Sequence, residues 1–409
     1  MKSPETLLLH LHTEEVENAL SELYHLISTT RPKNTGLFSG RIGQIMYYFY
    51  LAGYYRDESF ADRGVVLLEE VLQHIDEKSF AYPGRYSLSN GLSGFGFVLT
   101  LLKEEELLDV DFEDNLWLFD QHISVQALGE MKRGNTDYLH GTVGALFYLS
   151  IRLKSNSDLK EPIVQLVEKL RAIAVEDEKG MRFPNVFIAQ NNNSNNTNLG
   201  LAHGQCGILM VLLKVYEAGV ARRLIEEIVT KSIHYILGLR ARTNSAEGKI
   251  SVFPLTFDDT KPDQPQNDQY NARLGWCYGD LNETLLLYYA GALFNRFDWI
   301  KIADAVGFST LSRRTARETL ITDGNFCHGS IGVAQSYRRL FEMTGREAYL
   351  EGYQYWIGET MKYIKKSVSD ETFLPYAGEL LGGGVGVSLG LLSALSEQNL
   401  KWDRLFLLS

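Results

Sequence analysis

Two of the three cysteines in this 409-residue chain have neighbours that could share their chemistry. Cys327 is followed directly by His328, and Cys277 is followed by Tyr278. Three cysteines cannot build a disulfide framework, so a reducing, cytoplasmic setting is expected. Taken alone, a Cys-His pair also fits two small side chains that fill a turn before a helix. Its meaning therefore depends on the elements that position it.

A glycine pattern organises those elements. Gly-x-x-Gly recurs seven times along the chain, each time before an apolar run. Only the fifth copy departs, because Asn282 replaces its second glycine. Fixed repetition of this kind is typical of repeat architectures. The first glycines of the seven copies are Gly40, Gly91, Gly141, Gly204, Gly279, Gly329 and Gly383.

Amphipathic segments separate the copies. Their apolar residues recur with i, i+3, i+4 spacing, which predicts helices that cover a more apolar partner. We therefore expect an all-α fold of seven inner and seven outer helices, closed into an α/α toroid with a double ring, in a single domain 1–409. The third covering helix, within 114–130, has the weakest pattern. The other six segments are 16–29, 60–77, 161–177, 221–239, 298–308 and 346–366.

Two longer intervals interrupt the repeat, near 178–199 and 241–272. They contain strand-like stretches at 182–190 and 249–257 together with polar loop sequence. We interpret them as small β-containing surface insertions and, from their position, as candidates for peptide binding.

The residues just before the glycines carry thiol and imidazole groups. In a ring, the inner helices begin at one end, so side chains that precede the copies converge there. Two thiolates and one imidazole make a three-ligand Zn²⁺ set with a fourth position open, the pattern of catalytic zinc. Cys206 lies inside its copy and is predicted to be core, whereas a helix-start or surface position is the default expectation for His140. The converging residues are Asp137, His140, His203, Cys277, Cys327 and His328.

Three sequence blocks carry a resemblance. Leu201-Ala-His-Gly204, Arg273-Leu-Gly-Trp-Cys-Tyr-Gly-Asp280 and Phe326-Cys-His-Gly329 are similar to signature blocks of the lanthionine synthetase C-like family. The C-terminal Trp402–Leu408 resembles the end of stand-alone bacterial cyclases. The resemblance implies an α/α toroid with a central zinc. It also implies that cysteine thiols of a dehydrated precursor peptide are added to dehydroalanine or dehydrobutyrine, which forms (methyl)lanthionine rings.

The same resemblance assigns roles to individual residues. It implies that the zinc ligands are Cys277, Cys327 and His328, and that His203 is the acid/base residue. The further active-site positions that it implies are Asp137, Arg273 and Tyr278. We expect Asp137 to orient His203 and Arg273 to stabilise developing negative charge.

The resemblance also implies partners and a location. The expected partner is a leader-core precursor peptide, with a cognate dehydratase and exporter complex as further candidates. This places the protein in the cytoplasm, with peripheral association to a membrane-bound biosynthetic complex as one option.

One departure concerns the fifth copy. The family often has Gly-Asp-Pro-Gly where this chain has Gly-Asp-Leu-Asn, which ends at Asn282. Proline is favoured in the first helical turn, so its absence is expected to loosen this helix start without affecting the ligands.

The sequence argues against several other functions and leaves two alternatives open. The net charge of -11 argues against a nucleic-acid binder, and no run of 18 apolar residues predicts a membrane span. Toroidal glycosidases depend on paired carboxylates, which the Cys and His positions here do not supply. An enzyme that adds glutathione to dehydroamino acids and a non-catalytic peptide-binding scaffold stay open as alternatives.

Overall fold

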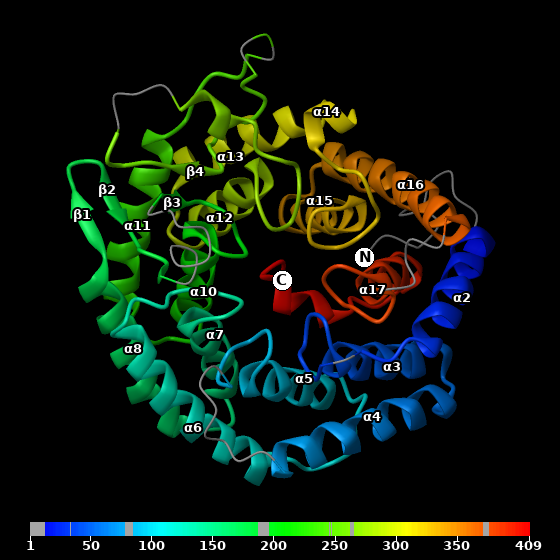
Figure 1. Ribbon diagram of the computed structural model, residues 1–409. Helices are drawn as coiled ribbons and strands as arrows, with labels where there is room; N and C mark the ends of the chain where they lie inside the picture. The colour runs from blue at the N-terminus through cyan, green and yellow to red at the C-terminus, as the bar shows by residue number, and fades with distance from the viewer. Residues whose placement is uncertain are drawn as a thin grey trace. The chain divides into compact units, whose positions relative to one another are not determined.

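The computed structural model describes residues 13–32, 34–77, 85–186, 196–244, 246, 248–261, 266–370 and 376–409. The described part of the chain is mainly helical, with two small antiparallel two-stranded sheets (Figure 1).

Each copy of the glycine pattern starts a helix, as predicted. The residue after the first glycine is the first helical residue in all seven copies. These glycine-led helices are buried along nearly their whole length. Most are apolar on all sides, whereas α12 and α15 also bury charged and amide side chains. They are α3 (Arg41–Tyr55), α5 (Leu92–Glu104), α7 (Thr142–Arg152), α10 (Gln205–Glu217), α12 (Asp280–Leu293), α15 (Ser330–Thr344) and α17 (Gly384–Leu395).

The predicted covering helices are present as well. In most of them the buried residues follow one face, and polar residues occupy the other. In α6 the buried residues also follow one face, but Trp117, Leu118 and Val125 on the outer face are exposed, in agreement with its weak sequence pattern. These helices are α2 (Thr13–Thr29), α4 (Glu58–Glu77), α6 (Glu113–Met131), α8 (Lys160–Ile173), α11 (Arg222–Gly238), α13 (Phe297–Thr310) and α16 (Glu347–Ser369).

The second glycine of a copy lets the preceding loop fold back on its own helix. A Cβ atom at Gly332, for example, would overlap the carbonyl oxygen of Phe326, six residues earlier. The absence of a side chain therefore brings the loop that carries Cys327 and His328 into direct contact with the first turn of α15.

The chain divides into two compact units. The first unit comprises the described residues of 1–85, 89–112 and 321–409. In this unit α3 packs on α4 and α15 on α16, while α17 contacts both α2 and α3 (Figure 1, blue, orange and red). A short 3-10 helix, η5 (Lys401–Phe406), packs against α5 near the end of the chain.

The second unit comprises residues 86–88 and the described part of 113–320. Here α12 packs on α13, α10 contacts α7, α11 and α12, and α6 contacts α7 and α8. The unit also holds the short helices η1 (Ser157–Leu159), η3 (Asn267–Tyr270) and α14 (Ala316–Thr319), and both sheets. The assignment of 1–409 to a single domain stays a prediction.

The strands lie partly elsewhere than predicted. A hairpin joins β1 (Val175–Asp177) to β2 (Gly180–Arg182), so the helix predicted for 161–177 ends early, at Ile173. Gly180 turns this hairpin with a φ of 120°, which favours glycine. The stretch predicted at 182–190 continues as irregular backbone to Asn185, and residues 187–190 lie outside the described ranges. From 249–257 only β4 (Thr256–Phe257) is a strand, paired with β3 (Thr197–Asn198).

None of the helices in the described ranges combines the length and apolar character that a membrane span needs.

Candidate metal centre and active site

The loop before α15 fixes Cys327 and His328 through their backbone. The amide of Asn325 is oriented so that its Oδ1 accepts the His328 N–H at 3.1 Å. The Cys327 N–H donates to the carbonyl of Leu381 at 3.0 Å. Asp323 supports the turn in addition, because its Oδ1 accepts the N–H of Asn325 at 2.9 Å. The two side chains therefore project from a restrained turn.

The loop before α12 holds Cys277 in a different way. The Cys277 carbonyl accepts the N–H groups of Leu201 at 3.0 Å and Ala202 at 3.4 Å. Asn282 adds a second connection to the same loop, since its Oδ1 accepts the Leu201 N–H at 2.8 Å and its Nδ2 donates to the Trp276 carbonyl at 2.9 Å. The backbone that precedes His203 is thereby bonded to the backbone that carries Cys277.

Asn282 bears on the prediction that the missing proline loosens the start of α12. The structure has no proline here, and the asparagine amide ties the first turn of α12 to both loops instead. Gly279 adopts a φ of 107°, whereas the first glycines before α3, α10 and α15 are extended. The fifth copy therefore begins its helix with its own backbone geometry.

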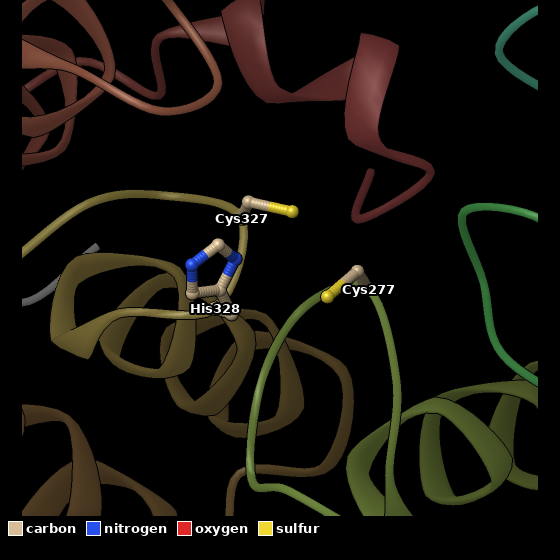
Figure 2. Close-up of side chains that lie close together, drawn as sticks. All are labelled: Cys277, Cys327 and His328. Atoms are coloured by element: carbon tan, nitrogen blue, oxygen red, sulfur yellow. The ribbon is translucent and has the colours of Figure 1, made fainter. Parts of the chain in front are cut away.

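The three predicted ligands form a group that could hold a metal ion. One ligand atom each from Cys277, Cys327 and His328 lies within 4.8 Å of the other two. Figure 2 shows the three side chains on the loops that precede α12 and α15. Cys277 is buried, and the other two are partly exposed. Two sulfur atoms and one imidazole nitrogen fit the preference of Zn²⁺ and leave one position of a tetrahedron open.

Asp137 and His203 form a second pair, in the second unit. The Oδ2 of Asp137 lies 2.8 Å from the Nδ1 of His203. Asn185 braces this pair, because its Nδ2 donates to the same carboxylate oxygen at 2.9 Å and to the His203 carbonyl at 2.7 Å. With Nδ1–H donated to a carboxylate, the neutral imidazole carries its lone pair on Nε2. The pair has the geometry of a general acid/base and its orienting carboxylate.

Electrostatics support an ionised Asp137. Burial on its own would raise the pKa of this carboxyl, but hydrogen bonds and charge from His203, together with Asn185 and the His140 N–H, outweigh burial and lower the pKa. The carboxylate is fully buried, whereas the His203 side chain stays 20% exposed. The histidine is therefore the solvent-accessible member of the pair.

His140 stacks on His203. The two rings lie 5.8 Å apart between centroids with an interplanar angle of 12°. Burial lowers the pKa of His140; Asp137 acts in the opposite direction, and His203 adds to the lowering. A neutral imidazole thus packs against the candidate acid/base. His140 directly precedes the N-cap residue of α7, Gly141, as its predicted helix-start position requires, and its ring lies beside His203.

The remaining two predicted site residues lie on the Cys277 loop. Tyr278 packs its ring against Gly200, and its hydroxyl accepts the Nδ2–H of Asn198 at 3.1 Å. Arg273 is half-buried, and its guanidinium makes no hydrogen bond or ion pair with any residue in the described ranges. The described contacts do not join Arg273 to the other predicted site residues.

A cavity of about 280 Å³ opens beside His203. Its polar lining includes Arg182, Asn185, Asn198 and Asp259. Arg182 is held there by Asp177 and Asp259, each at 2.9 Å.

Asn185 and Asn325 support the site and were not predicted from the sequence. Asn185 lies in a stretch that reads as a strand, and a single asparagine there gives no signal. Asp137 was predicted, but not its second role: its Oδ1 accepts the His140 N–H at 2.8 Å. Asn325 takes the equivalent position before α15, where it accepts the His328 N–H. A comparison of the two copies could have suggested this role, because both residues lie four positions before the first glycine.

Comparison with solved structures identifies the fold class. The chain is similar to nisin cyclase, with a TM-score of 0.76 and 16% sequence identity over 97% of each chain. The likeness shows that the fold is an α/α toroid. An unsaturated glucuronyl hydrolase from Streptococcus agalactiae matches with a TM-score of 0.45 and 13% identity over 98% of this chain and 97% of that chain.

The family follows from the sequence. A family model described as lanthionine synthetase C-like protein matches residues 31–407. The chain therefore belongs to the lanthionine synthetase C-like family. No curated protein matches the chain.

Proposed function

We propose that the protein is a zinc-dependent lanthipeptide cyclase. Its substrate would be a dehydrated precursor peptide whose cysteine thiols add to dehydroalanine or dehydrobutyrine within the same chain. The observation that carries the proposal is the Cys277, Cys327 and His328 group, together with the Asp137–His203 pair, whose His203 loop is hydrogen-bonded to the Cys277 carbonyl.

The donor set explains why a metal is needed. A free cysteine thiol has a pKa of about 8.5, so only a few per cent is thiolate at neutral pH. Zn²⁺ held by Cys277, Cys327 and His328 would supply Lewis acidity that lowers the pKa of a substrate thiol. Hydrogen bonds within the protein restrain the backbone of Cys277, Cys327 and His328. The three donors would therefore need little rearrangement to bind the ion.

The proton balance assigns work to His203. When the substrate sulfur forms a bond to Cβ of the dehydro residue, the Cα–Cβ π pair moves to Cα and the carbonyl as an enolate. The thiol loses one proton and Cα gains one, so the mass of the peptide is unchanged. His203 would donate the proton at Cα, and Asp137 would hold Nδ1 so that Nε2 points to the substrate.

Arg273 and Tyr278 complete the proposed site. Arg273 has no partner within the described residues, which leaves its guanidinium available for the developing enolate oxygen. Tyr278 is oriented by Asn198 and would contact the peptide beside Cys277. A dehydratase and an exporter are the proposed partners of this cytoplasmic enzyme, because dehydration must precede the addition and the cyclised product must leave the cell.

The test is a mass-balance experiment. The zinc-loaded protein is incubated with a dehydrated precursor peptide in the presence of glutathione, and the product is treated with a thiol-alkylating probe. A cyclase removes free thiols without adding mass to the peptide. Glutathione adducts would instead indicate a glutathione-adding enzyme, and unchanged thiols without adducts would indicate a binding scaffold.

A further inference from the structure

The C-terminal segment has a feature that the proposed mechanism does not use. Trp402, Asp403 and Phe406 of η5 are all 0% exposed, although they lie within eight residues of the last position, Ser409. We call these three residues the C-terminal clamp. All of their contacts described below lie within the first unit.

The aromatic residues of the clamp enclose Phe326, which directly precedes Cys327. The Phe406 ring is stacked on Phe326 with 3.9 Å between centroids and an interplanar angle of 30°. Trp402 meets Phe326 edge-on at 5.4 Å. The Trp402 indole is itself fixed, because its Nε1–H donates to the Ser393 hydroxyl at 2.8 Å. Aromatic contacts of this kind favour one orientation of the Phe326 side chain.

Phe406 also reaches Cys327 by a second route. Its ring lies 5.9 Å from that of Phe38. The Phe38 carbonyl accepts the N–H groups of Leu380 and Leu381, at 2.9 and 3.0 Å, and the Leu381 carbonyl accepts the Cys327 N–H. One buried ring thus contacts the loops before α3 and α15, and hydrogen bonds extend this connection to the loop before α17.

The charged member of the clamp holds the helix that follows His328. The Asp403 carboxylate receives hydrogen bonds from Arg339 Nε at 2.6 Å and Gln335 Nε2 at 2.7 Å. Both residues belong to α15, whose first residue, Ser330, follows His328 by two positions. Arg339 is only 3% exposed, so the ion pair is nearly dry and its geometry is specific.

We propose that the C-terminal clamp is a positioning device for Cys327 and His328. Trp402 and Phe406 hold the side of the loop that leads into Cys327, and Asp403 holds the helix that leaves His328. Residues that orient ligands tune metal affinity without touching the metal. The inference rests on the proposed metal site, and it assigns to Trp402, Asp403 and Phe406 an effect on that site which a purely structural role would not have.

The test compares Phe406→Leu with a matched control in the full chain. Tyr349→Leu removes another ring that is 0% exposed in the first unit and is stacked on Tyr337 in α15. Zinc affinity is measured by competition with a chromophoric chelator, and thermal stability is measured beside it. Phe406→Leu should weaken zinc binding roughly 10- to 100-fold. Tyr349→Leu should lower stability and leave zinc affinity near the wild-type value.

A second variant, at the other ring of the stack, repeats the test. Phe326→Leu removes the same stack from the loop side and should weaken zinc binding as Phe406→Leu does. The proposal is overturned if zinc affinity follows thermal stability alike in all three variants, or if the two stacking variants bind zinc as the wild type does.

A metal-free measurement separates this proposal from the proposed function. The rate of Cys327 alkylation by iodoacetamide is followed by peptide mapping in the apo protein. Faster alkylation in Phe406→Leu than in Tyr349→Leu supports the clamp, and equal rates contradict it. If the wild type binds no zinc, the proposed metal site fails, whereas the alkylation rates still decide whether the clamp positions the loop.

Discussion

At the scale of single residues, Asp137 joins two loops with one carboxylate. Its Oδ1 accepts the backbone N–H of His140, and its Oδ2 meets the His203 ring. The stacked His140 ring limits how the His203 ring can turn. Asp137 is a buried carboxylate with a lowered pKa, and it contacts a partly exposed imidazole. This arrangement is more typical of a proton-transfer site than of a packing contact.

Replacement of Asp137 tests this pairing. Asp137→Asn keeps the shape of the side chain but removes the charge that stabilises an imidazolium and fixes its tautomer. We expect cyclisation to slow by about 100-fold or more, within the range known for general acid–base catalysis, with zinc content unchanged. The rate is read from the loss of alkylatable peptide thiols. Asp298→Asn, at an exposed ion pair, is the control and should retain the wild-type rate.

His140 predicts a pH dependence of stability. Its pKa is lowered in the folded chain, so below its ordinary value of about 6.5 the unfolded chain binds more protons than the folded one. The free energy of unfolding should therefore decrease as the pH falls from neutrality through this window. His140→Phe removes the titrating group and should flatten the decrease. Urea unfolding from pH 7 to pH 5 measures the difference, and parallel curves for the two proteins would refute the assignment.

The predicted ligands could be identified from the sequence more readily than the residues that hold the site in place. Cys277, Cys327 and His328 could be selected because a repeat places them at equivalent points of two copies. Asn185 could not, because its contacts to Asp137 and His203 span 48 and 18 positions along the chain. Such long-range contacts depend on the tertiary fold and leave no local pattern.

At the scale of elements, Asp280 at the start of α12 anchors the loop that carries Cys277. Its carboxylate accepts the N–H groups of Val252 and Phe253 and pairs with Arg313 at 3.3 Å. Arg313 in turn donates to the Ala272 carbonyl at 2.6 Å, so both ends of the 272–280 loop are tied together. Burial raises the pKa of Asp280, although Arg313 and the two N–H groups act in the opposite direction.

Removal of Asp280 alone should therefore destabilise the folded protein. Asp280→Ala removes the carboxylate that pairs with the buried Arg313, which should reduce the free energy of unfolding by about 3–5 kcal/mol. Urea unfolding measures this loss. The double variant Asp280→Ala with Arg313→Met should lose less than the sum of the single variants, since it removes both charges. Additive losses would show that the two side chains do not interact.

Helices are predictable here and strands are not, for a physical reason. A helix such as α4 or α16 shows its buried face in local spacing. The strands β1, β2, β3 and β4 are two or three residues long, and their pairing depends on contacts outside the strand itself. Gly180, pressed against Lys231 and Tyr235 of α11, decides where the first hairpin turns.

At the scale of the whole molecule, zinc binding should add to stability. An ion that binds only the folded chain stabilises it by about 2.7 kcal/mol when its free concentration is 100 times its dissociation constant. Thermal unfolding should therefore occur at a higher temperature with buffered zinc than with a chelator. Cys327→Ala should abolish this shift. An equal shift in wild type and Cys327→Ala would mean that the stabilising zinc binds elsewhere.

If the Cys277, Cys327 and His328 group and His203 act together to form thioether rings, the loss of peptide thiols should require both zinc and His203. A dehydrated peptide of known cysteine number is incubated with zinc-loaded wild type, metal-free wild type or His203→Ala, and alkylatable thiols are counted by mass over time. We expect rapid loss of thiols at constant peptide mass only with the zinc-loaded wild type, and much slower loss with the other two proteins. Equal thiol counts in all three reactions would contradict this expectation.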